Sequence, residues 1–357
     1  QAEESALHAA QSDIEGAAAY LSQAAALRSS RAVLAQVRLD YRRAARHCWS
    51  AARCLPLRNK GERWRLARQQ VALLMREVEI TRDPTLLAEA IEVLVGALPL
   101  AEGAPEQDAL ARTNFALGDA LMSQGVMVRA ADSLSDAIRN FRDAIELFSQ
   151  KRLMDDWAAA QIKLGDAFEA RGRLTGAHDD PVQAVAAWRA AAGIVTRERL
   201  PILFAETHYK IGRSLLDQAD VDPSRYDAAI GALRIAASVP GLSGDVRNKI
   251  TVDLVRAELR VARTRGDQTA ERQALDAFRD VLPQLEGVLE PMTWARMQHE
   301  YASALWRHAA TSGELASFSA AAQAMMAALD AFETAGAEID AQAARDASAN
   351  GLLFSLN

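Results

Sequence analysis

The sequence contains few cysteines, which could cross-link the chain, and few prolines and glycines, which would interrupt helices. Its 357 residues include two cysteines, ten prolines and nineteen glycines, and 6% are aromatic. Cys48 and Cys54 cannot build the disulfide framework of a small secreted domain, and on a helix they point about 240° apart. We therefore expect reduced thiols in a cytoplasmic protein. Because residue 1 is Gln rather than Met, an export signal removed from the native chain is also compatible with the sequence.

Long apolar runs and a large charge excess are also absent. No stretch approaches 18 uninterrupted apolar residues, so we expect no membrane span. Half of the residues are hydrophobic, a quarter are charged and the net charge is −6, which excludes wholesale disorder. Strand-forming residues do not cluster, and this leaves an all-α fold as the expectation.

A repeat of about 47 residues organises the chain. Small residues recur at a constant spacing of 47: Gly125, Gly172, Ala219, Gly266 and Gly313. Alanines recur at spacings of 45 or 47: Ala90, Ala137, Ala184, Ala229, Ala274 and Ala321. These alanines stand in apolar stripes typical of an amphipathic helix. We expect the first set to close the first helix of each unit, and Asp-Pro pairs at 83–84, 180–181 and 222–223 to begin several second helices.

The repeats predict an all-α solenoid of about seven antiparallel helix pairs. The expected units are 1–56, 57–101, 102–150, 151–199, 200–241, 242–289 and 290–336, followed by a capping helix at 338–349. No linker rich in Pro, Gly or Ser divides the chain. We therefore expect one domain over 1–357, with atypical units at 1–101, the best-matching units at 102–241 and degenerate units with the cap at 242–357.

Equivalent positions within the units predict how the helices pack. Phe141, Trp188 and Phe278 share one place in successive second helices and are expected to fill the space between units. Trp49 matches the same apolar pattern one period before Leu94. Gly118, Gly165 and Gly212 are expected to let the two helices of a pair touch, because a side chain there would meet the neighbouring backbone.

Two motifs carry a family resemblance. Leu117-Gly118-Asp119-Ala120-Leu121 with Gly125, and Leu164-Gly165-Asp166-Ala167-Phe168 with Gly172, resemble the first helix of a tetratricopeptide repeat. The run from Asp156 to Gly165 resembles long bacterial variants of that repeat. The similarity is greatest over 106–240 and weaker over 84–98 and 242–336; the period exceeds the family's usual 34 residues, and Leu259 stands where glycine is expected. The resemblance implies a right-handed superhelix whose first helices line a concave face, and it implies binding rather than catalysis.

Patterns typical of catalytic and metal sites are missing. His299 and His308 fall on opposite faces of a helix, His47 and Cys48 diverge by about 100°, and no spacing matches a zinc site. Neither a glycine-rich phosphate loop nor a nucleophile elbow occurs. The carboxylate pairs at 155–156 and 179–180 fall at expected turns and helix starts. We expect a protein that is not an enzyme and binds neither a metal nor a cofactor.

Residues 47 apart in successive first helices predict a ligand groove. Lys163, Lys210 and Arg213 would form a basic stretch, Phe115 and Tyr209 an apolar floor, and Asp119 and Asp166 an acidic edge. Relatives that hold a C-terminal carboxylate place Asn, Lys and Arg at such positions, and the two aspartates would repel that group. The mixed charge favours a longer polypeptide. The predicted groove residues are Arg112, Phe115, Asp119, Lys163, Asp166, Tyr209, Lys210 and Arg213.

Charge is distributed unevenly along the chain. Residues 28–82 hold fourteen Lys and Arg against four acidic residues, a net charge of +10, and the remaining chain carries −16. Arg38, Arg42 and Arg46 are spaced four apart, so their guanidiniums share one helix face and can bind carboxylates or phosphates. Two interpretations remain open: a solvated face paired with acids of the next unit, or a surface for an acidic partner.

The combined pattern favours a non-catalytic cytoplasmic scaffold or adaptor that binds a protein or peptide in its concave groove. One alternative is a ligand-sensing or autoinhibitory arm of a larger signalling or transcription protein. Nucleic-acid binding through residues 28–82 ranks third, because the exposed aromatics typical of single-strand binders are not interleaved there. The partner and the oligomeric state are left open by the sequence.

Overall fold

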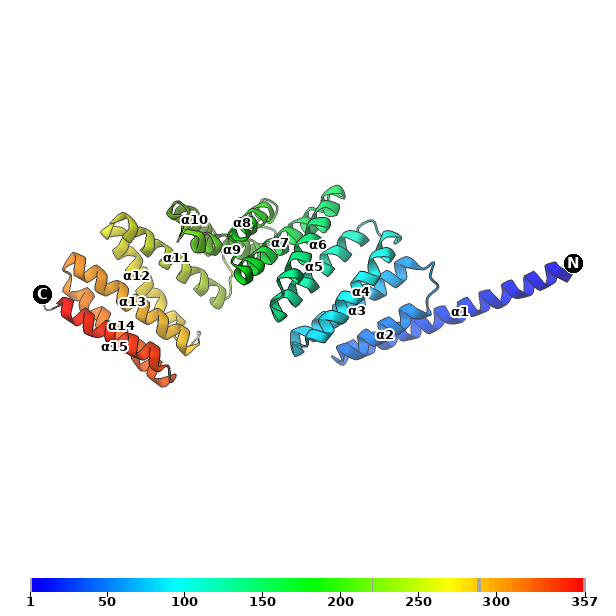
Figure 1. Ribbon diagram of the computed structural model, residues 1–357, viewed down its shortest axis with the longest axis horizontal. Coiled ribbons are helices and arrows are strands. Elements are labelled where there is room, and N and C mark those ends of the chain that lie inside the picture. Colours follow the sequence, from blue (N-terminus) through cyan, green and yellow to red (C-terminus); the bar gives the residue numbers. More distant parts are fainter. Residues whose placement is uncertain (1, 220, 288–289, 356–357) are drawn as a thin grey trace. The chain divides into compact units, whose positions relative to one another are not determined.

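Helices make up nearly all of the chain in the computed structural model, which describes residues 2–219, 221–287 and 290–355 (Figure 1). No strand occurs within these ranges. The paired helices are α1 (Ala2–Val37) with α2 (Tyr41–Cys54), α3 (Lys60–Thr81) with α4 (Pro84–Glu102), α5 (Ala109–Val128) with α6 (Ala131–Gln150), α7 (Met154–Thr175) with α8 (Asp179–Ala192), α9 (Pro201–Ala219) with α10 (Tyr226–Ala237), α11 (Gly244–Arg265) with α12 (Gln268–Leu285), and α13 (Pro291–Ser312) with α14 (Leu315–Thr334). A 3₁₀ turn, η1 (Pro223–Arg225), precedes α10, and α15 (Glu338–Ser355) follows the last pair.

This element order confirms the predicted repeat. The chain is an all-α solenoid of tetratricopeptide-like helix pairs, and the pairs match the expected units. The odd-numbered member of each pair is called here its first helix and the even-numbered member its second helix. The final helix begins at the predicted residue but extends to Ser355 rather than 349.

The helices group into two compact units, Gln1–Val195 and Thr196–Asn357. The first holds α1–α8 and the second holds α9–α15. A single domain over 1–357 stays a prediction, and each unit is described on its own below.

The predicted close approach of paired helices is confirmed, although the neighbour is a side chain rather than the backbone. A Cβ atom on Gly165 would lie 2.5 Å from Nε1 of Trp188, and one on Gly118 would lie 2.8 Å from the Phe141 ring. Both aromatic side chains are fully buried. Nε1 of Trp188 donates a hydrogen bond to the Ile162 carbonyl at 3.2 Å. Each glycine therefore makes room for the large residue of the second helix that fills the pair.

The expected helix ends are correct at two glycines and wrong at two others. Gly266 and Gly313 end α11 and α13 in the left-handed conformation, with φ of 67° and 72°. Gly125 and Gly172 instead lie inside α5 and α7. A Cβ atom on Gly125 would lie 2.6 Å from Cγ of Leu134 in α6, so that glycine serves close packing rather than helix termination.

The Asp-Pro pairs are helix starts in two cases of three. The Asp83 carboxylate accepts a hydrogen bond from the Thr85 backbone N–H at 2.9 Å and caps α4. Asp222 caps η1 in the same way through Ser224 N–H, at 3.2 Å. Asp180 is instead the second residue of α8; it is buried, and its carboxylate accepts two hydrogen bonds from Arg171, at 2.7 and 2.8 Å.

Two helices are apolar enough to bear on the expectation that the chain has no membrane span. By length and mean hydropathy, α4 and α14 could each cross a membrane, a test that core helices of soluble proteins also pass. The apolar face of α4 packs into the core through Leu86, Leu87 and Leu94. A few polar residues interrupt the apolar ones in α4 and α14, so the criterion of an uninterrupted apolar run does not identify these two helices.

Candidate functional site

Polar contacts link successive first helices at a constant separation of 44 residues. Equivalent positions in successive repeats are 47 residues apart. Each contact therefore joins a residue of one repeat to a residue that lies three positions, or about one helical turn, before the equivalent position in the next repeat. The contacts within the first unit are Arg112–Asp156 (3.1 Å) and Asp119–Lys163 (2.6 Å). Those within the second unit are Tyr209–Asp253 (2.8 Å), Arg256–Glu300 (2.6 Å) and Arg296–Asp340 (3.4 Å).

These contacts engage several of the predicted groove residues with acids or bases of the neighbouring repeat. Arg112 also donates to Asp108 one turn earlier on α5. Oη of Tyr209 donates to Asp253 and accepts from Arg213 at 3.4 Å. Burial, followed by the Asp253 charge, raises the pKa of Tyr209 to about 12. These polar side chains bind one another between neighbouring repeats, so they are less available to bind a ligand.

The remaining groove residues are partly covered. Phe115 is half-buried, with its ring 5.8 Å from that of Phe141 in an edge-on arrangement. Asp166 accepts a hydrogen bond from Trp188 Nε1 at 3.1 Å. Lys210 is half-buried and Arg213 is exposed. Residues 112–166 of the set belong to the first unit and 209–213 to the second, so their assembly into one ligand surface stays a prediction.

The basic cluster on α1, α2 and the turn between them is different. The predicted row of Arg38, Arg42 and Arg46 on one helix is wrong, because α1 ends at Val37 and Arg38 lies in the turn, while Arg42 and Arg46 lie on α2. The cluster comprises five exposed arginines: Arg31, Arg38, Arg42, Arg43 and Arg46. None of them forms an ion pair with a carboxylate within the described parts of the chain. The neighbouring acid, Asp40, accepts from the Arg43 backbone N–H at 3.0 Å as the cap of α2. No ion pair joins these arginines to acids of the next unit in the described residues, but acids of that unit lie nearby: the pKa of Asp83, lowered mainly by its hydrogen bonds with Thr85, is lowered further by the Arg42 charge, and Arg46 lines a groove with Glu89 and Glu92.

A cavity of about 510 Å³ lies between α1 and α2 within this cluster. Its lining residues are Arg31, Leu34, Ala35, Arg38, Asp40, Arg43 and His47. Burial lowers the pKa of His47, and the charges of Arg43, Arg31 and Arg46 lower it further. The cavity combines an apolar floor with positive charge, which suits an anionic group carried on an apolar segment.

An exposed tryptophan on α2 was missed by the repeat pattern. Leu94 is 1% exposed, whereas Trp49, its equivalent, is 49% exposed. The helix α2 buries Ala44, Cys48 and Ala51 instead, so it is turned by about one residue from the predicted face. The Arg53 guanidinium lies 4.7 Å from the Trp49 ring centroid. The sequence signal was the flanking of Trp49 by Arg46 and Arg53, one turn away on either side.

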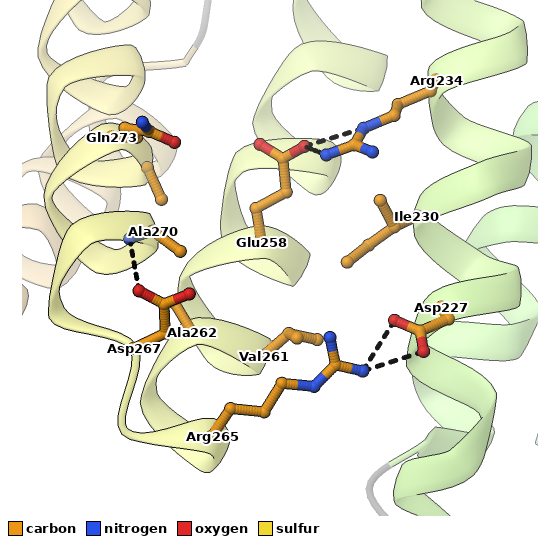
Figure 2. A pocket seen from close by; sticks show the side chains of 11 residues that line it. Asp227, Ile230, Arg234, Glu258, Val261, Ala262, Arg265, Asp267, Ala270 and Gln273 are labelled. Atoms are coloured by element: carbon orange, nitrogen blue, oxygen red, sulfur yellow. Dashed lines mark hydrogen bonds and ion pairs between the residues drawn. The ribbon is translucent and has the colours of Figure 1, made fainter.

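Figure 2 shows a groove of the second unit that is built differently, between α10, α11 and α12. Its volume is about 410 Å³. One Nη atom of Arg265 donates to both carboxylate oxygens of Asp227, each at 2.8 Å. Arg234 donates through Nε and Nη2 to Glu258, at 3.0 and 2.7 Å. The arginines of this groove are therefore neutralised within the fold.

His308 and the two cysteines are buried in the core. Nδ1 of His308 lies 3.2 Å from Glu271, which also accepts from Arg263 at 2.8 Å. Burial raises the pKa of Cys48 to about 11, so this free thiol is uncharged at neutral pH. Within the described ranges, no three His, Cys, Asp or Glu side chains gather in a way that could hold a metal ion.

Neither a protein-family model nor a curated protein matches this sequence. Among solved structures, BtubC from P. vanneervenii is similar over 75% of this chain and 92% of its own, with 16% identity and a TM-score of 0.46. The C-terminal part of a TPR repeat-containing protein from Cytophaga hutchinsonii is similar over 77% and 94%, with 12% identity and a TM-score of 0.46. A Rap protein complexed with competence and sporulation factor is similar over 92% and 98%, with 9% identity and a TM-score of 0.41. At these values, functional inference rests on the residues of this chain.

Proposed function

We propose that this protein is a non-catalytic scaffold or adaptor that binds an acidic segment of a partner protein on α1 and α2. The observation that carries the proposal is the set of five exposed arginines without an ion pair, on a chain whose remaining residues are net acidic. Guanidiniums bind carboxylates in a planar, bidentate geometry. A surface of fixed, unneutralised charge also steers an oppositely charged partner toward it.

A pull-down with two matched variants tests this function. The docking variant carries Arg38→Glu, Arg42→Glu and Arg46→Glu. The control variant carries Arg234→Glu, Arg265→Glu and Arg279→Glu, three exposed arginines of the second unit that are ion-paired. Proteins retained by the wild type and by the control, lost from the docking variant, and acidic in sequence are expected. If both variants retain the same proteins as the wild type, the docking surface lies elsewhere.

The face formed by the first helices is the second candidate surface for the same function. Its charged residues are engaged with one another, and this ranks it below α1 and α2. The variants Tyr209→Ala and Lys210→Glu separate the two surfaces, because they leave α1 and α2 unchanged. Loss of the partner from these variants, but not from the docking variant, would assign binding to the first-helix face.

Nucleic acid is the competing ligand for a basic surface. Its binding would weaken steeply with salt and would be insensitive to the sequence of the strand. A single-stranded DNA oligonucleotide that bound as tightly as an acidic peptide of equal charge would favour this alternative. The sensory-arm alternative predicts instead that the native gene continues into an effector domain.

A further inference from the structure

The helix α1 carries an apolar stripe that faces solvent. Its larger members are Tyr20 (73% exposed), Leu27 (67%), Val33 (52%), Leu34 (60%) and Val37 (75%). Tyr20, Leu27 and Leu34 are seven residues apart, the spacing of a helix-packing seam. The opposite face of α1 packs on α2 through Ala25, Ala32 and Ala35. An exposed stripe of this kind marks an interaction site more often than a solvated face.

In the described residues, no second helix other than α2 packs on α1. A first helix inside the solenoid packs against the second helices on both sides, as α3 does against α2 and α4. The stripe corresponds to the side of a first helix that in α3 packs on a second helix, so a helix is the shape that fits it.

Charge borders the stripe on one side only. Arg31 lies within about 60° of Leu27 and Leu34 around the helix, and Arg38 follows in the turn directly after Val37. They lead to Arg43 of α2 across the 510 Å³ cavity. The other border holds Ser29 and Gln36, which are uncharged. A helix seated here would meet basic groups along one flank and none along the other.

We propose that α1 binds an amphipathic acidic helix of the partner, with its apolar face on the Tyr20–Val37 stripe and its carboxylates directed at Arg31, Arg38 and Arg43. This inference rests on the proposed function and adds the conformation and the apolar anchors of the ligand. A helix with carboxylates on one flank binds in one direction, because the reverse orientation would move them to the uncharged border.

Charge favours this ligand over a second copy of the chain. In an antiparallel pairing of two copies, the flank that carries Arg31 would face the same basic flank of the other copy. Like charges brought together at an interface oppose association. An acidic helix removes that repulsion and supplies the carboxylates that the five arginines lack.

Synthetic helical peptides of about 20 residues, long enough to be helical in water, provide the probe. The first peptide carries Leu at heptad a and d positions and Glu on one flank. The second replaces each Leu by Ser at the same charge, and the third replaces each Glu by Lys. Binding is measured by fluorescence anisotropy to the wild type, to Leu27→Ser/Leu34→Ser, and to Val221→Ser/Ile339→Ser, a control with two exposed apolar residues of the second unit. Circular dichroism checks that each variant is folded.

The expected result is binding of the first peptide to the wild type and the control, at least tenfold weaker binding to Leu27→Ser/Leu34→Ser, and no binding of the third peptide. Equal affinity of the first and second peptides, with both weakened by Arg38→Glu, would overturn the helix inference and leave the proposed function standing. Failure of both acidic peptides to bind would overturn both. A wild-type dimer in sedimentation that becomes monomeric in Leu27→Ser/Leu34→Ser would show that the stripe binds a second copy instead.

Discussion

The arginines of α1 and α2 and those of the α10–α12 groove differ in what surrounds them, not in exposure. Arg234 and Arg265 have side chains 65% and 59% exposed, and each meets a carboxylate of the facing helix (Figure 2). Arg38, Arg42 and Arg46 are also exposed, but within the described residues they form no ion pair with a carboxylate. The difference shows that the placement of the acids decides whether exposed arginines are ion-paired within the fold. In the second unit an acid stands opposite each of these guanidiniums, whereas residues 28–82 hold four acids in total.

The largest expected effect is the loss of a paired arginine with a buried partner. Arg171→Met removes both hydrogen bonds to Asp180, whose side chain is 5% exposed, and leaves that carboxylate buried without its partner. We expect a loss of about 3 kcal/mol in the free energy of unfolding. Arg38→Met, which breaks no ion pair, is expected to unfold at the same urea concentration as the wild type. A similar loss in both variants would contradict the distinction between paired and unpaired arginines.

Salt sharpens the comparison at the level of binding. Raising the ionic strength from 0.05 to 0.5 M should weaken the binding of an acidic peptide to the wild type by roughly tenfold, because exposed charges are screened. The residual affinity of Arg38→Glu/Arg42→Glu/Arg46→Glu should vary less over the same range. Fluorescence anisotropy at several salt concentrations measures both slopes, and parallel slopes would argue against electrostatic docking on α1 and α2.

A smaller effect is expected from an exposed ion pair. Arg265→Met breaks the ion pair with Asp227, and the side chains of both residues are largely exposed. The expected loss is about 0.5 kcal/mol of stability or less, since solvent screens such pairs. Peptide affinity should be unchanged. Chemical denaturation and anisotropy of the same sample provide the two numbers, and a change in affinity would show that the Figure 2 groove takes part in binding.

The smallest effect concerns His47, at the edge of the α1–α2 cavity. Its pKa is lowered by burial and by Arg43, Arg31 and Arg46, against the opposing charge of Asp40. An acidic ligand favours the protonated imidazole and raises this pKa, so affinity should increase by up to about twofold as the pH falls from 7 to 5.5, where carboxylates of ordinary pKa are still almost fully ionised. Titrations of His47→Gln across the same range should be flat. An equal rise in that variant would assign the pH dependence to another group.

The sequence predicts architecture better than it predicts sites, for a physical reason. Gly118 faces Phe141 and Gly165 faces Trp188 because a larger residue in place of the glycine would clash with the aromatic ring. This requirement recurs in each repeat, so the small and large residues recur in the sequence with the same period. The contacts at 44-residue separation, such as Asp119–Lys163, depend on a shift of about one turn between neighbouring helices, which the period does not contain. The same reason explains Trp49: a turn of α2 by about one residue changes a predicted core residue into a half-exposed one. Helix ends are predicted only in part. Asp83 caps α4 as predicted, whereas Asp180 lies inside α8, where it contacts Arg171.

Titration of the leucine–glutamate peptide against three proteins tests the central claim most directly. The proteins are the wild type, Arg31→Glu/Arg38→Glu/Arg43→Glu, and Arg234→Glu/Arg265→Glu/Arg279→Glu, each with helical circular dichroism verified. We expect the first variant to bind about a hundredfold more weakly than the wild type, which corresponds to about 2.8 kcal/mol, and the second to bind as the wild type does. Equal affinity for all three proteins, or equal loss in both variants, would contradict the assignment of α1 and α2 as the docking surface.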